Sequence, residues 1–165
     1  MKQPYTTKTL TRMGMMAAIT LLLTLIPKIP IPLGYAHLGN VAVLLFSLRY
    51  APGEAGAAVA AGSALADFFG GFPLWILPTL IIKYVMAVLV WNIAGGTDSR
   101  LRAVAGFLAA SLWMALGYTL CGAILYDSLA AGLASTPGLL MEGGLSIAAA
   151  VLALVIIKRR SRHSA

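Results

Sequence analysis

The chain carries little charge for its length. Only 10% of its 165 residues are charged, whereas a soluble domain has about 25%. By contrast, 60% of the residues are hydrophobic and the mean hydropathy is +0.90. This composition excludes an ordinary soluble domain. It predicts an integral membrane protein in which residues 1–165 form a single transmembrane domain.

Sequence motifs of common enzyme and metal sites are also missing. The single cysteine, Cys121, lies in an apolar run, which excludes an internal disulfide and a cysteine-rich metal site. There is no G-x-x-x-x-G-K-[ST] phosphate loop, so the chain cannot use ATP by that route. H-E-x-x-H, C-x-x-C and G-x-S-x-G are absent as well. We therefore predict no enzyme activity, no cofactor and no metal site.

The basic residues lie at the ends of the apolar runs. A net charge of +7 in a soluble protein would suggest nucleic acid, but this placement is the one that the positive-inside rule describes. We therefore predict membrane lipid and no nucleic acid as a partner, and both termini in the cytoplasm of a prokaryotic cell. The residues counted on the cytoplasmic side of this inner or plasma membrane are Lys2, Lys8, Arg12, Arg49, Arg100, Arg102, Lys158, Arg159, Arg160 and Arg162.

The apolar runs predict an all-α, multi-pass fold. A membrane-spanning helix needs about 20 mostly apolar residues, and proline-rich or glycine-rich segments separate the runs. We expect the last helix to open at Ser135 or Thr136, because Pro137 is tolerated in a first turn. The six expected transmembrane helices are 8–26, 36–50, 52–70, 76–94, 103–126 and 136–157.

Lys83 and Glu142 lie deep inside two of these predicted helices. Charges within a membrane are costly and mark functional sites by default. At 1.5 Å per residue, Lys83 and Glu142 each lie on the order of 10 Å below the outer surface. Equal depth and opposite charge predict that they share one cavity and bind a ligand there. A structural ion pair between the two helices is the alternative interpretation.

Aromatic residues accompany these charges. Tyr118 and Tyr126 project from one face of their helix with Gly122 between them, and Trp75 lies in the turn-rich segment before Lys83. Aromatic rings suit a flat ligand, although ordinary helix packing would explain the same stripe. A small heteroaromatic vitamin or precursor fits these residues. Pyridoxine and hydroxymethylpyrimidine are the first compounds to test.

Small residues mark one face of the first predicted helix. Gly14 and Ala18 form a small-xxx-small pattern, and Ala17 lies beside it. Such patterns allow two membrane helices to approach closely. We predict that these three residues bind a partner helix.

Four segments, in this order, resemble the substrate-binding (S) components of energy-coupling factor (ECF) transporters, the vitamin importers of prokaryotes. They are HLGN at 37–40, GSALADFFGGFPLWILPTLIIK at 62–83, GYTLCGAILY at 117–126 and TPGLLMEGG at 136–144. The resemblance implies a six-helix bundle with an outward-facing site gated by the first and third outer loops. It adds His37 and Asn40 to the substrate-binding candidates Lys83, Glu142, Tyr118, Tyr126 and Trp75.

The resemblance also implies partners and a function. A transmembrane coupling protein would contact Gly14 and Ala18, and two cytosolic ATPases would drive the import of a small water-soluble vitamin. This chain departs from the family where relatives often carry Asn and Gln, since it has Leu139 and Glu142 at those places. The alternative function is a self-sufficient proton-coupled carrier, in which Glu142 or Asp67 takes the proton.

Overall fold

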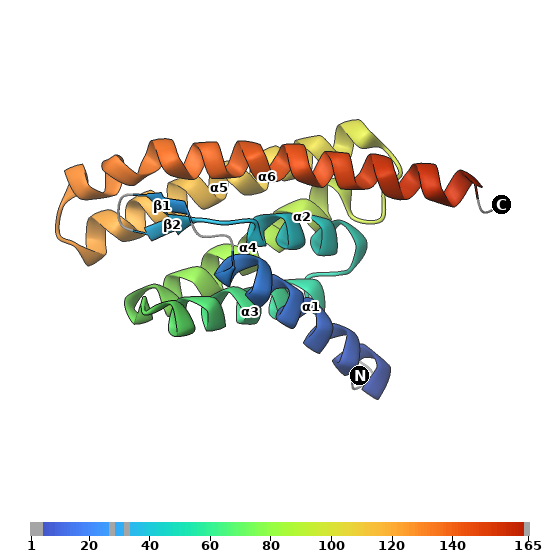
Figure 1. Cartoon of the computed structure of the whole chain (residues 1–165), viewed down its shortest axis with the longest axis horizontal. Helices are drawn as coiled ribbons and strands as arrows, with labels where there is room; N and C mark the ends of the chain where they lie inside the picture. Colours follow the sequence, from blue (N-terminus) through green and yellow to red (C-terminus); the bar gives the residue numbers. More distant parts are fainter. Residues whose placement is uncertain (1–4, 27–28, 32–33, 164–165) are drawn as a thin grey trace.

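The computed structural model describes residues 5–26, 29–31 and 34–163, and over these residues it has six α-helices and one short hairpin (Figure 1). The strands β1 and β2 pair antiparallel, with Pro30 opposite Tyr35. A short 3-10 helix leads directly into α4. The elements are α1 (Thr7–Leu25), β1 (Ile29–Ile31), β2 (Gly34–Ala36), α2 (Gly39–Arg49), α3 (Ala55–Gly70), η1 (Pro73–Trp75), α4 (Ile76–Ala94), α5 (Arg100–Leu125) and α6 (Leu129–His163).

A short hairpin accompanies the six helices of the predicted all-α fold. The proline-rich segment was predicted to be a loop, and α2 was predicted to begin at residue 36. Ala36 instead pairs with Ile29, so α2 begins three residues later, at Gly39. Proline is tolerated here because both strands of a two-stranded sheet are edge strands.

The start of α6 is a second correction. The helix begins at Leu129 and not at residue 136, because the Ser128 hydroxyl accepts a hydrogen bond from the Ala131 amide at 3.2 Å and caps it. Pro137 therefore lies inside the helix, where it cannot donate to a carbonyl in the preceding turn. Membrane helices tolerate such a proline when nearby side chains and neighbouring helices satisfy the backbone.

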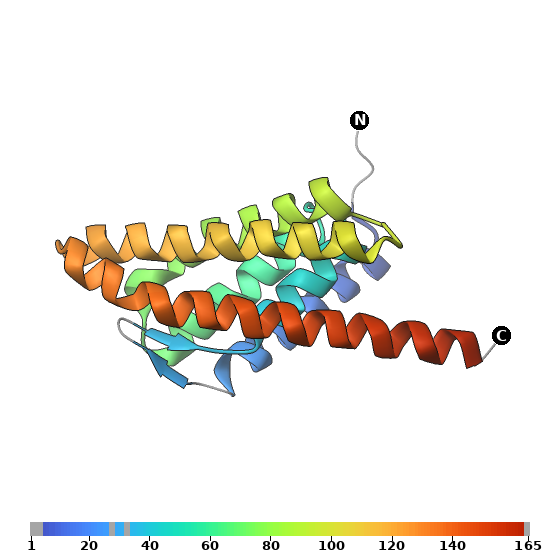
Figure 2. The ribbon, with the colours of Figure 1, turned by 90° about the horizontal axis from the view of Figure 1, so that it is seen from above.

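The helices pack around α2. The helix α1 packs on α3, α3 packs on α4, α4 packs on α5, and α5 packs on α6. The helix α2 contacts α1, α4 and α6 from the inside of the bundle. Figures 1 and 2 show α2 between the α5–α6 pair and the α1–α3–α4 group. The largest fully buried apolar side chains of this core are Val43, Leu44, Val59, Met86, Val90, Phe107 and Met114.

The connections fall at two ends of the molecule. The β1–β2 hairpin, the α3–α4 turn and the α5–α6 turn lie at one end, which we call the hairpin end (Figure 1). Both termini and the α2–α3 and α4–α5 connections lie at the other end, and α6 extends beyond the bundle there (Figure 2). The loops predicted to face outward are thus together, and the loops predicted to face the cytoplasm are together.

Within the part of the chain that the structure describes, three segments are long and apolar enough to cross a membrane. They are Pro73–Ala94, Arg100–Leu125 and Leu129–Arg159. The helices α2 and α3 are apolar but have only 11 and 16 residues. Six complete crossings and the cytoplasmic location of the termini therefore stay predictions.

Candidate functional site

An asparagine side chain joins the two buried charges. Lys83 Nζ donates a hydrogen bond to Asn40 Oδ1 at 2.5 Å, and Asn40 Nδ2 donates to Glu142 Oε1 at 2.5 Å. Asn40 and Lys83 are each 1% exposed, and Glu142 is 4% exposed. These residues come from α2, α4 and α6, so the three helices meet here. We call this group the Lys–Asn–Glu bridge.

A fourth helix, α5, contributes a thioether to the bridge. Met114 Sδ lies 3.0 Å from Asn40 Nδ2 and 3.8 Å from Lys83 Nζ. Sulfur is only a weak acceptor, so the oxygen contacts of Asn40 dominate. The carboxylates whose charges act on Lys83 are Glu142 and Asp67. Glu142 belongs to α6 and Asp67 to α3.

The bridge also reaches the hairpin. His37, between β2 and α2, has Nδ1 3.4 Å from Glu142 Oε1. The same nitrogen accepts the Gly39 amide proton at 3.1 Å, so in this geometry Nδ1 acts as an acceptor. A Cβ at Gly39 would collide with the Thr24 side chain and crowd His37. Glycine at this position therefore lets the chain turn closely from the hairpin into α2.

Three aromatic side chains lie between the bridge and the hairpin end. Trp75 packs against Tyr118 and Tyr126 with ring centroids 5.6 and 6.3 Å apart, and its Nε1 lies 3.4 Å from the Tyr126 hydroxyl. The Tyr118 hydroxyl is 3.0 Å from that of Thr79, and its ring centroid is 5.3 Å from Lys83 Nζ. This aromatic cluster (Trp75, Tyr118 and Tyr126) is therefore continuous with the buried charges.

Six of the seven residues predicted to bind substrate form these two connected groups, and the seventh, His37, lies beside Glu142. Their binding role stays a prediction. The depth estimate placed Lys83 and Glu142 at one level, and in the structure Asn40 joins them. Sequence analysis missed two features: the bridging geometry of Asn40, and Thr79 as the partner of Tyr118. Thr79 lies one helical turn before Lys83, so helical spacing was the signal that would have found it.

The predicted partner-binding residues divide between two environments. Gly14 and Ala18 are exposed on α1, and a Cβ at Gly14 would meet no atom within 4 Å. Ala17 is half-buried, and its backbone lies against Gly62 of α3. The exposed surface therefore contains Gly14 and Ala18, while Ala17 belongs to the contact between α1 and α3.

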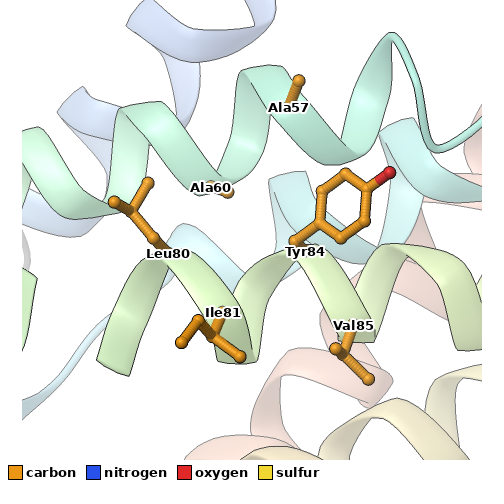
Figure 3. Close-up of a pocket in the computed structure, with 6 residues that line it drawn as sticks. All are labelled: Ala57, Ala60, Leu80, Ile81, Tyr84 and Val85. Carbon is orange, nitrogen blue, oxygen red and sulfur yellow. The ribbon is translucent and has the colours of Figure 1, made fainter. Parts of the chain in front are cut away.

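A groove lies on a different face from the bridge. It has a volume of about 450 Å³ and runs between α3 and α4 (Figure 3). Its lining is almost entirely apolar, whereas Lys83 points from α4 into the core. Over residues 5–26, 29–31 and 34–163, no group of three or more His, Cys, Asp or Glu side chains is placed to hold a metal ion. The residues lining the groove are Ala57, Ala60, Leu80, Ile81, Tyr84 and Val85.

Two comparisons with known proteins found matches. A family model described as "ECF-type riboflavin transporter, S component" matches residues 4–160. This match confirms the predicted resemblance to S components. An uncharacterized protein in the gap 3′ region of Pyrococcus woesei is 36% identical over 105 residues, which cover 62% of this chain and 70% of that protein.

Proposed function

The chain belongs to the family of ECF-type riboflavin transporter S components, a family of membrane transport subunits, and on that premise we propose that it captures a vitamin or vitamin precursor for import. The observation that carries the proposal is the Lys–Asn–Glu bridge beneath the aromatic cluster. It combines opposite charges, hydrogen-bonding groups and flat apolar surfaces in one buried place. Such a combination suits a small polar compound with an aromatic ring.

The cost of the bridge favours a binding role over a purely structural one. Burying a lysine and a glutamate pays a large desolvation penalty, and apolar residues of similar size often stabilise a protein equally well. Charged residues within membrane segments are accordingly rare and functional by default. Ligand binding explains why a lysine and a glutamate are buried here, and helix packing alone does not explain it.

The proposed substrate is a small, water-soluble heteroaromatic compound. Trp75, Tyr118 and Tyr126 offer aromatic surface, while Lys83 and Glu142 offer a donor and an acceptor. The family description names riboflavin, so riboflavin joins pyridoxine and hydroxymethylpyrimidine as compounds to test. The chain itself catalyses no reaction in this proposal.

The proposed transport needs partners. A transmembrane coupling protein would dock on Gly14 and Ala18, and two cytosolic ATPases would supply the energy. In this arrangement residues 1–165 form one domain in a prokaryotic inner or plasma membrane, with six crossings and cytoplasmic termini. The hairpin end then faces outward, which is the side from which the substrate arrives.

Native mass spectrometry of the purified chain tests the capture role. We expect a bound heteroaromatic compound to co-purify in equal molar amount, and calorimetric titration to show tight binding of that compound without its chemical conversion. A chain that carries no ligand, binds none of the three candidate compounds and transports none would contradict the proposal.

A further inference from the structure

Three contacts tie the start of α1 to the connection between α2 and α3, at the end opposite the hairpin. Arg12 donates a hydrogen bond from Nη2 to Glu54 Oε2, and the two side chains form an ion pair. The Arg12 guanidinium carbon also lies 4.6 Å from the centroid of the Tyr50 ring. Just before α1, the Tyr5 hydroxyl donates to the Gly53 carbonyl oxygen at 3.1 Å. We call Tyr5, Arg12, Tyr50, Gly53 and Glu54 the α1 clamp.

Glu54 directs its carboxylate toward α1 and not toward its own helix. It is the residue that precedes α3, yet its side chain makes no capping hydrogen bond there. Tyr50 is the residue at which α2 ends, so Arg12 contacts both sides of the α2–α3 connection. An arginine suits this position because its planar guanidinium can stack on an aromatic ring while it pairs with a carboxylate.

The clamp lies on the face of α1 opposite the small residues. Helical residues are about 100° apart, so Gly14 and Ala18 lie about 200° and 240° around α1 from Arg12. Met16, one turn after Arg12, is 2% exposed and packs against the start of α3. Contacts on this side of the helix therefore set the direction in which Gly14 and Ala18 face.

Stability alone does not account for the clamp. The Arg12 and Glu54 side chains are 34% and 26% exposed, and ion pairs near the surface contribute little to the free energy of folding. Within the described residues, Arg12 Nε is buried without a hydrogen-bond partner, which reduces the gain further. The pair therefore matters more for where the start of α1 lies than for whether the chain folds.

The clamp is remote from the Lys–Asn–Glu bridge. Asn40 is in the first turn of α2 and Tyr50 ends that helix. A rise of 1.5 Å per residue therefore separates them by about 15 Å. Changes in the clamp side chains should accordingly leave the bridge and the aromatic cluster intact.

We propose that Arg12 and Glu54 are positioning residues for the docking of the coupling protein. Their ion pair holds the first turns of α1 against the α2–α3 connection, so that Gly14 and Ala18 face the partner helix. The inference rests on the proposed function and adds to it residues that touch neither the substrate nor the partner. When the pair is lost, the start of α1 is released, and the partner has to fix its orientation on binding.

Four variants of the full-length chain test the proposal. Arg12→Gln and Glu54→Gln each break the pair, and the double variant with Arg12→Glu and Glu54→Arg restores it with the charges exchanged. Lys8→Gln is the matched control, because it removes a positive charge from an exposed position one turn before Arg12. Each chain is titrated with a purified complex of the coupling protein and its two ATPases. We expect about two- to fivefold weaker binding for the single variants, recovery in the double variant and no change in the control.

Two further measurements separate positioning from a general loss of structure. Whichever of riboflavin, pyridoxine and hydroxymethylpyrimidine binds to the unaltered chain should bind equally well to all four variants. With Cys121 replaced, a cysteine at the buried Met16 should react faster with a membrane-permeant thiol reagent when the pair is broken, and Lys8→Gln should not change this rate. The labelling needs no partner, so it tests the clamp separately from the proposed function.

Several results would overturn the inference and leave the proposed function standing. Undiminished binding of the partner complex by both single variants is one of them. A double variant as weak as the single ones would mean that Arg12 or Glu54 contacts the partner directly, and an equal loss in Lys8→Gln would leave only an effect of net charge. A parallel loss of small-molecule binding would mean that the pair only supports the fold.

An unaltered chain that does not bind the partner complex would remove the proposed coupling, and this inference with it. If Arg12→Gln does not fold, Arg12→Lys takes its place, because it keeps the charge and loses the stacking on Tyr50. We expect Arg12→Lys to weaken binding of the partner complex as well, and unchanged binding would count against the clamp.

Discussion

The substitution Glu142→Gln changes the bridge with little change of shape. Glutamine keeps a side-chain oxygen that accepts from Asn40 Nδ2, a contact of 2.5 Å in the structure. It removes the negative charge beside Lys83, and Asp67 is then the carboxylate that still acts on the lysine. The variant therefore isolates the contribution of charge at a position that is 4% exposed.

The expected magnitude follows from this burial. Removing one member of a fully desolvated ion pair costs about 3–5 kcal/mol, because the other charge is left unmatched. Asn40 separates the two charges here and Asp67 remains, so we expect a smaller loss. A loss of about 1.4 kcal/mol still corresponds to a factor of ten in affinity. We therefore predict that Glu142→Gln binds the co-purified ligand at least tenfold more weakly and unfolds at a lower temperature.

Calorimetric titration and thermal unfolding of the same preparations provide the assay. Asp127→Asn is the matched control, since it also removes one carboxylate but at an exposed turn at the hairpin end. Asp127 has φ 46°, a conformation that asparagine also tolerates, so this control should leave both measurements unchanged. If Glu142→Gln lowers the melting temperature and leaves the affinity unchanged, the bridge only braces the helices and the reasoning is refuted.

Three further predictions concern the helix contacts and the topology. Gly62→Leu should lower the melting temperature strongly, because a Cβ there collides with the backbone of α1. Gly14→Leu should not lower it, because a Cβ at Gly14 meets no atom within 4 Å. Equal melting temperatures of the two variants would contradict this packing. Gly14→Leu should instead keep ligand affinity and abolish ATP-driven uptake, since its bulk would hold a partner helix away; normal uptake would remove the proposed interface. With Cys121 replaced, a cysteine at the exposed Leu74 should react with an impermeant thiol reagent from outside and one at Ser99 should not; the opposite labelling would invert the topology.

The sequence predicted helix boundaries best where turn-forming residues enclose a continuous apolar run. The run 76–94 was predicted with the boundaries that α4 has, because turn-forming residues enclose a continuous apolar segment. The predicted start of α6 was wrong, because Pro137 was interpreted as a first-turn residue. Ser128 caps the helix earlier in the chain. The hairpin depends on pairing between two short backbone segments, and side-chain periodicity does not report that pairing.

The sequence predicted that Lys83 and Glu142 lie at the same depth, but not which side chain connects them. A rise of 1.5 Å per residue is enough to place Lys83 and Glu142 at one level. The position of Asn40 between them depends on how α2 packs among its neighbours, which helix spacing within one segment does not specify. Likewise, Ala17 and Ala18 are adjacent in sequence, yet only Ala17 lies against α3 because successive helical residues point in different directions.

Uptake into sealed vesicles tests the central claim most directly. Vesicles that contain the chain together with a coupling protein and two ATPases would be compared with vesicles that contain the chain alone. The proposed capture role predicts that the co-purified ligand accumulates only when the partners and ATP are present. Accumulation by the chain alone, driven by a pH gradient and lost in Glu142→Gln, would identify a proton-coupled carrier and contradict the account.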